Sequence, residues 1–173
     1  MVKSEFRRVA EKHNCKLQVS DNDIAIGMGV RSPRVIYRLI CDYKSSEIII
    51  DNKTGFEFVG NVSCWFKPTH NSLSLNLSTK THFNRIFSRA KNPFKIDVNN
   101  YSLDTFLKNS SALKSLETIA KTTKFEPQII GSYNNGRYHL KTTYHLQFKN
   151  WEQALDPLLL FYKEFIDNFS VNT

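Results

Sequence analysis

The sequence predicts an α+β fold in which antiparallel strands fill the N-terminal half and a β-α-β-β-α order follows. Residues 34–78 alternate runs of β-branched and aromatic residues with short polar turns, as hairpin-linked strands do. The Asn-Asn-Gly at 134–136 separates two further strand-like runs, and Asn-Gly supplies the positive φ of a tight hairpin turn. Residues 151–169 carry apolar side chains at helical spacing. Because hairpin links dominate, strands and helices are partly segregated, which is typical of α+β proteins.

The N-terminal half is expected to hold one helix followed by a run of strands. Residues 3–14 place apolar side chains on one helical stripe, with Ser4 as the N-cap. Strand-like runs follow at 23–26, 34–43, 47–51, 56–66 and 73–78. Turn residues at 27–33 separate the first two runs. In the fourth run, the even-numbered residues from Phe56 to Phe66 are expected to face the core, because side chains alternate along a strand.

The C-terminal half is expected to end in a long amphipathic helix packed on the sheet. Before it come a short strand, one helix and a hairpin, over residues 94–98, 103–121, 125–133 and 137–148. Asn150 can cap the last helix, and Asp156-Pro157 is either a bend in that helix or its true start.

The length of 173 residues fits one domain over residues 1–173. Residues 79–93 are the candidate seam of a two-lobed interior, because the pattern of periodicity changes there. The N-terminus lacks the apolar stretch of a signal peptide. The longest strongly apolar run, 158–162, is far shorter than the roughly 20 residues of a membrane span. These features predict a cytoplasmic protein.

The three cysteines are odd in number and widely spaced, at Cys15, Cys41 and Cys64. They form neither a disulfide framework nor the spacing of a zinc site, so reduced and buried thiols are expected.

Positive charge is concentrated in the middle of the chain. The formal net charge is +8, and no acidic residue lies between Glu57 and Asp97. Within that gap, residues 80–95 interleave cations with phenylalanines; the cations singled out as a polyanion site are Lys80, Arg85, Arg89, Lys91 and Lys95. A second acid-free stretch, between Glu126 and Glu152, contains Arg137, Lys141 and Lys149. By contrast, the C-terminal helix is acidic.

This distribution favours a non-catalytic binding protein whose segment 80–95 contacts a polyanion, with nucleic acid ahead of an anionic membrane or an acidic protein. Clustered Lys and Arg release counterions from a phosphate backbone, and aromatic rings can stack on unpaired bases. One competing interpretation is a solvated loop that Phe83, Phe87 and Phe94 anchor to the core; another is that these cations pair with the acidic C-terminal helix inside the fold.

The sequence holds no pattern that argues for a metal, a cofactor or catalysis. His139 and His145 share a face of one predicted strand but lie roughly 20 Å apart, too far to share a metal ion. The Gly-x-Gly at 27–29 lacks the third glycine and the helix of a dinucleotide site. His82 beside Arg85 and Arg89 has the groups for phosphodiester cleavage, but its partner would have to come from elsewhere in the chain, with His70 as the candidate.

Two other binding functions remain open. Leu160 and Phe161 widen the apolar stripe of the last helix beyond one face, which would suit a protein partner or a homodimer. Alternatively, the aromatic residues could line a small-molecule cavity under that helix.

Overall fold

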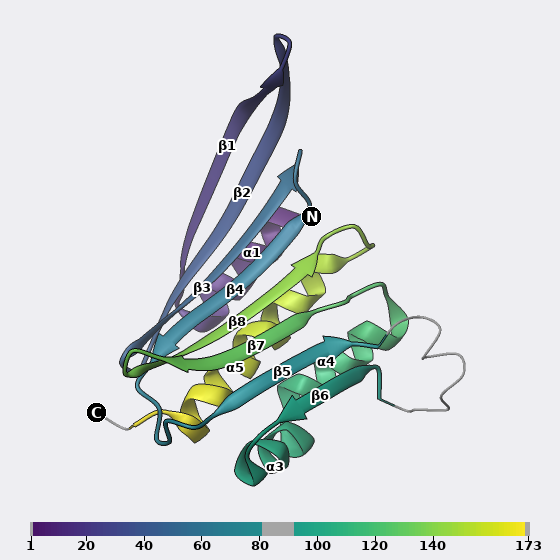
Figure 1. Cartoon of the computed structure of the whole chain (residues 1–173). Coiled ribbons are helices and arrows are strands. Elements are labelled where there is room, and N and C mark those ends of the chain that lie inside the picture. Colours follow the sequence, from purple (N-terminus) through teal and green to yellow (C-terminus); the bar gives the residue numbers. More distant parts are fainter. Residues whose placement is uncertain (1, 81–91, 172–173) are drawn as a thin grey trace.

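The computed structural model describes residues 2–80 and 92–171, and in them the predicted α+β class is confirmed. Eight antiparallel strands form one sheet in the order β1-β2-β3-β4-β8-β7-β5-β6 (Figure 1). The strands are β1 (Lys16–Gly27), β2 (Val30–Tyr43), β3 (Ser46–Gly55), β4 (Val59–Phe66), β5 (Ser74–Thr79), β6 (Phe94–Val98), β7 (Gln128–Asn134) and β8 (Arg137–His145). β5 and β6, which flank the candidate seam, pair with each other in this sheet.

The helices cover one face of the sheet. They are α1 (Val2–His13), α3 (Tyr101–Asn109), α4 (Ser111–Thr122) and α5 (Leu155–Phe169), with a 3₁₀ turn η1 (Trp151–Ala154) before α5. Figure 1 shows α1, α4 and α5 on the same side of the sheet, and α1 packs on β1 and β2 while α5 packs on β4. The opposite side, which we call the open face, carries no helix in the described part of the chain.

Alternation along the strands separates a dry face from a wet one. In β8, Tyr138, Leu140, Thr142 and Tyr144 are buried under the helices, whereas the residues between them are at least partly exposed. Tyr162 of α5 reaches into this layer, where burial raises the pKa of its hydroxyl. That hydroxyl donates to the Val62 carbonyl at 3.0 Å and bonds with Thr142 Oγ1 at 2.9 Å. A polar tether therefore fixes the last helix to β4 and β8 within an apolar core.

The first hairpin is longer than the sequence predicted. Instead of a short strand at 23–26 and a break near Pro33, β1 and β2 run 12 and 14 residues and turn at Met28-Gly29. Gly27 and Gly29 adopt positive φ there, which glycine tolerates best. Pro33 fits inside β2 because its carbonyl accepts from Phe56 N on the side where pairing with β3 has ended. Its missing N–H faces that same side, so no ladder bond is lost.

The start of β4 also differs from the prediction. β4 begins at Val59, so Phe56 and Phe58 precede it and are 56% and 44% exposed rather than inward-facing. The even positions from Gly60 to Phe66 are buried, as predicted.

The helix predicted over 103–121 is two helices, because Ser110 interrupts it. Ser110 has extended ψ (120°), and its Oγ accepts from Leu113 N as the N-cap of α4. Asn150 does not cap the last helix; it adopts a left-handed conformation, and α5 begins at Leu155. Pro157 then lies in the first turn, where its missing N–H has no intrahelical partner to lose.

The expectation of three reduced thiols is wrong, because the structure joins Cys15 to Cys41 by a disulfide. Cys15 directly precedes Lys16, which pairs with Ile40, so the strand register brings Cys15 opposite Cys41. Their Cα atoms are 4.4 Å apart. Only Cys64 is a buried free thiol, and burial raises its pKa to about 12. Within the described residues, no helix is long and apolar enough to cross a membrane.

Replacing Tyr162 with Phe should lower the free energy of unfolding by about 1–3 kcal/mol, because Val62 and Thr142 lose a buried hydrogen-bond partner. Urea unfolding followed by circular dichroism measures this change. Tyr101→Phe is the matched control. Because Tyr101 is exposed, loss of its hydroxyl should change the free energy of unfolding by less than about 0.5 kcal/mol. Equal effects of the two substitutions would contradict the tether.

Alkylation of the unfolded chain without a reductant should modify one cysteine, Cys64, because Cys15 and Cys41 are joined. After reduction, all three should react, and mass spectrometry counts the added groups. Three modified cysteines before reduction, in protein alkylated at the moment of cell lysis, would show that the disulfide does not form in the cell.

Candidate functional site

The structure does not gather the predicted cations of segment 80–95 at one site. Arg85, Arg89 and Lys91 lie outside the described residues. Lys80 lies on the helix side, where its Nζ donates to the Asn92 carbonyl at 3.2 Å and borders a hollow next to α3 and α4. Lys95 lies on the open face, opposite Ser78. The two described ends of the segment therefore point to opposite sides of the sheet.

The prediction that Leu160 and Phe161 of the last helix form a partner surface is wrong for Phe161. Phe161 is fully buried, with its ring against Phe106 and Phe165, so it cannot meet a partner of the folded chain. Leu160 is partly buried and packs against the core. The wide apolar stripe of α5 arises because sheet and helices cover it from more than one side.

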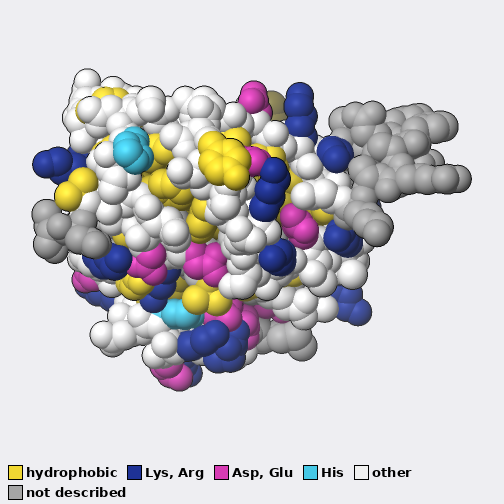
Figure 2. Space-filling view, turned by 90° about the horizontal axis from the view of Figure 1, so that it is seen from below, with side chains coloured by type: hydrophobic (Ala, Val, Ile, Leu, Met, Phe, Trp, Pro, Cys, Tyr) yellow, Lys and Arg dark blue, Asp and Glu magenta, His cyan; other side chains and the backbone are white. Residues whose placement is uncertain are grey.

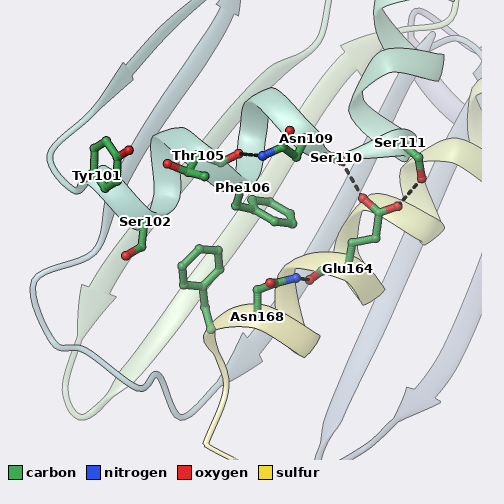
Figure 3. A pocket seen from close by; sticks show the side chains of 10 residues that line it. Tyr101, Ser102, Thr105, Phe106, Asn109, Ser110, Ser111, Glu164 and Asn168 are labelled. Carbon is green, nitrogen blue, oxygen red and sulfur yellow. Dashed lines mark hydrogen bonds between the residues drawn. The ribbon is translucent and has the colours of Figure 1, made fainter.

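A groove of about 560 Å³ lies between α3 and the C-terminal part of α5 (Figure 3). Phe106 and Phe169 supply its apolar walls, and hydroxyl and amide side chains of α3 and α5 line the remainder. Seen from below, Figure 2 shows hydrophobic side chains near the middle of this end of the molecule, with basic and acidic side chains interspersed around them. The groove is the feature nearest to the small-molecule cavity expected beside the last helix.

The charged group in this groove is Glu164, and it is already engaged. Its carboxylate accepts from Ser110 Oγ and Ser111 Oγ, both at 2.6 Å, and from Ala112 N at 3.3 Å. These bonds join α5 to the start of α4, where a carboxylate is favoured by the helix dipole. No Lys or Arg belongs to the described lining of the groove, so it does not attract a polyanion.

The open face of the sheet divides into two halves by its charges. On the β1–β3 half, basic side chains are neutralised by neighbours: Arg38 binds Asp51 at 2.6 Å. Lys53 and Arg34 approach Glu57 at 3.2 and 3.7 Å. These pairs leave little net charge on that half.

The other half, made by β4, β8, β7, β5 and β6, is basic. Asp97 is the only acidic residue in these five strands. Lys95, Arg137 and Lys141 are exposed on the open face, and none forms an ion pair with a described carboxylate. We call these three cations the basic patch.

Two aromatic rings lie beside Arg137 and Lys141 of the basic patch. Trp65 of β4 and His139 of β8 are opposite each other in the register, and their rings stack with centroids 3.9 Å apart and planes 2° from parallel. Trp65 remains 39% exposed. The pKa of His139 is lowered, first by burial and then by the charge of Lys141, which favours the neutral imidazole. Arg137 Nη2 donates to the Trp65 carbonyl at 3.2 Å, which holds the guanidinium beside the ring pair.

The acid-free stretch after Glu126 is visible in the sequence, but the sequence does not identify it as part of a site. The alternation in β8 is the available signal, because Arg137, His139 and Lys141 are spaced by two and share one face of a predicted strand. That these residues share one half of the open face with Trp65 and Lys95 depends on the strand order, which local patterning does not reveal. Among the residues that the structure describes, no cluster of three His, Cys, Asp or Glu side chains could hold a metal ion.

The fluorescence of Trp65 should decrease as the pH falls, because a protonated imidazole stacked on the indole quenches it. The midpoint should lie below 6.5, the ordinary histidine pKa, since burial and Lys141 lower the pKa of His139. A pH titration of tryptophan emission measures this transition. The variants Trp65→Phe and His139→Gln should each abolish it; persistence in His139→Gln would contradict the assignment.

Comparison with known proteins finds no matching family model, no matching curated protein and no matching solved structure.

Proposed function

We propose that this protein binds nucleic acid across the basic half of its open sheet face. The observation that supports the proposal is that Lys95, Arg137 and Lys141 lie on one half of the open face without carboxylate partners among the described residues, with Arg137 and Lys141 on either side of His139 in the Trp65–His139 ring pair. Lys and Arg bind the phosphate backbone through charge and counterion release, while rings provide sites for base stacking.

The spread of the basic patch favours a polymeric anion over a small one. Arg137 and Lys141 are four residues apart on β8, hence about 13 Å at the usual rise per strand residue. Lys95 lies three strands further across the sheet, about 14 Å from β8 at the usual strand spacing. One phosphate cannot reach all three cations, whereas successive phosphates of one chain can.

The cations predicted from the sequence extend this proposal. Residues 81–91 connect β5 to β6, the two strands at the edge of the basic half. Arg85, Arg89 and Lys91, which lie outside the described residues, remain candidate phosphate contacts from the sequence, whereas Lys80 is on the helix side.

A cytoplasmic location remains a prediction from the sequence. The Cys15–Cys41 disulfide favours an oxidising environment instead, since cytosolic reductants keep most thiols reduced. A disulfide that forms only on oxidation is compatible with the cytoplasmic prediction, whereas a permanent disulfide favours a ligand encountered outside the reducing cytosol.

The charge-reversal pair Arg137→Glu and Lys141→Glu should weaken binding of a fluorescein-labelled 20-nucleotide DNA or RNA by more than tenfold. Fluorescence anisotropy at several salt concentrations measures the affinity. The slope of log K against log salt should become shallower by about 0.7 for each phosphate of a single strand that no longer meets a cation. The pair Arg85→Ala and Arg89→Ala tests the sequence-predicted segment in the same assay.

The matched control is Lys121→Glu with Lys124→Glu, which changes the net charge equally at the end of α4, on the helix side. Its affinity should stay within about threefold of the parent protein. Equally weakened binding by both charge-reversed proteins would mean attraction by overall charge and would overturn the proposed site. Absence of binding by the parent protein at low salt would overturn the function.

A further inference from the structure

We infer that an unpaired nucleobase stacks on the outer face of His139, in a slot above Ser132, and that the ligand is therefore single-stranded. This inference rests on the proposed function and specifies its ligand. Three features of the open face support it: the direction of the ring pair, the size of the neighbouring side chains and the positions of the cations.

The ring geometry shows where a further ring can be added. The Trp65 and His139 rings are 2° from parallel with centroids 3.9 Å apart, so their normals point roughly along the line from β4 to β8. The next strand on that line is β7, where Ser132 is directly opposite His139. Neighbouring strands are about 4.8 Å apart, so a planar group stacked on the free face of His139 would lie above Ser132.

Small side chains leave this position open. Ser132 is exposed, and the next residue in the same row is Ser74 of β5, also small and exposed. Ile130, two residues before Ser132 on the same face and 43% exposed, borders the slot with an apolar side. The row therefore consists of two aromatic rings followed by two serines, with an apolar border for the edge of a base.

The opposite side of the ring pair is less suitable for a nucleotide. There, Glu47, Trp65 and Arg137 line a hollow of about 190 Å³ between β3 and the end of β4. There the charge of Glu47 offsets that of Arg137, which lines the same hollow, whereas no acidic residue follows His139 in its row across β7 and β5. The charge distribution thus selects the Ser132 side.

Two cations flank His139 along its strand. Arg137 and Lys141 lie two residues before and after His139 on the same face of β8, each about 7 Å away along the strand. A phosphate next to a base stacked on His139 can therefore meet Lys141, whereas the Arg137 guanidinium is held on the Trp65 side of the ring pair and can meet the next phosphate along the strand. In a duplex, both faces of a base are covered by its neighbours, so only an unpaired base can take this position.

Replacing Ser132 with Leu should fill the slot and raise the Kd for a 12-nucleotide single strand roughly tenfold, since the stacking of one base on His139 is lost. The slope of log K against log salt should stay unchanged, because the cations still meet the phosphates. The conservative variant Ser132→Ala leaves the slot open and should bind like the parent protein. In a strand containing 2-aminopurine, binding should quench its fluorescence with the parent protein but not with Ser132→Leu.

His139→Gln provides a second test, because it removes the ring without adding volume. It should weaken binding by the same tenfold and likewise abolish the quenching, and unfolding curves establish that each variant is folded. Unchanged affinity and quenching in both variants, with parent binding intact, would overturn the base slot but not the proposed function. Equal affinity of the parent protein for a duplex and a single strand would also overturn the inference, whereas no binding to either would overturn the function itself.

Discussion

The packing of α5 against β4 and β8 is the interaction on which the rest of the structure depends. Phe165 touches the rings of Phe66 and Tyr138 on the sheet and of Phe106 on α3, so one side chain joins three elements. The Tyr162 hydroxyl, bonded within this apolar layer, adds direction to packing that is otherwise non-directional. Aromatic packing of this kind dominates core energetics because each ring buries a large apolar area.

That packing makes the two faces of the sheet different. With all described helices on one side, the strands place most of their apolar residues there and mostly polar residues on the other side, as antiparallel sheets with one wet face do. The open face is thus free to carry charge without a cost to the core. Its β1–β3 half is neutralised by ion pairs such as Arg38–Asp51, whereas the half around β8 keeps cations without described carboxylate partners beside two stacked rings. The fold therefore gathers part of the net positive charge on one half of the open face.

The groove beside α5 shows why a pocket alone is a weak guide to function. It is larger than the hollow beside Trp65 on the open face, yet its carboxylate, Glu164, is occupied in joining α5 to the start of α4. The polar side chains that line the groove mostly form hydrogen bonds at the ends of helices. The basic patch is flatter, but its charged groups form no described ion pair, and available charge on a rigid sheet is the stronger indication of a ligand.

The sequence by itself determined the α+β class, the hairpin at Asn135-Gly136, the inward face of β4 from Gly60 and the amphipathic last helix, because these follow from periodicity and turn chemistry over neighbouring residues. It also located the acid-free stretches that supply the cations. Strand order and register came only from the tertiary structure. They join Cys15 to Cys41, set Trp65 against His139, separate Lys80 from Lys95 and bury Phe161. Each of these arrangements depends on residues distant in the chain, and local patterning carries no information about which strand will lie beside which.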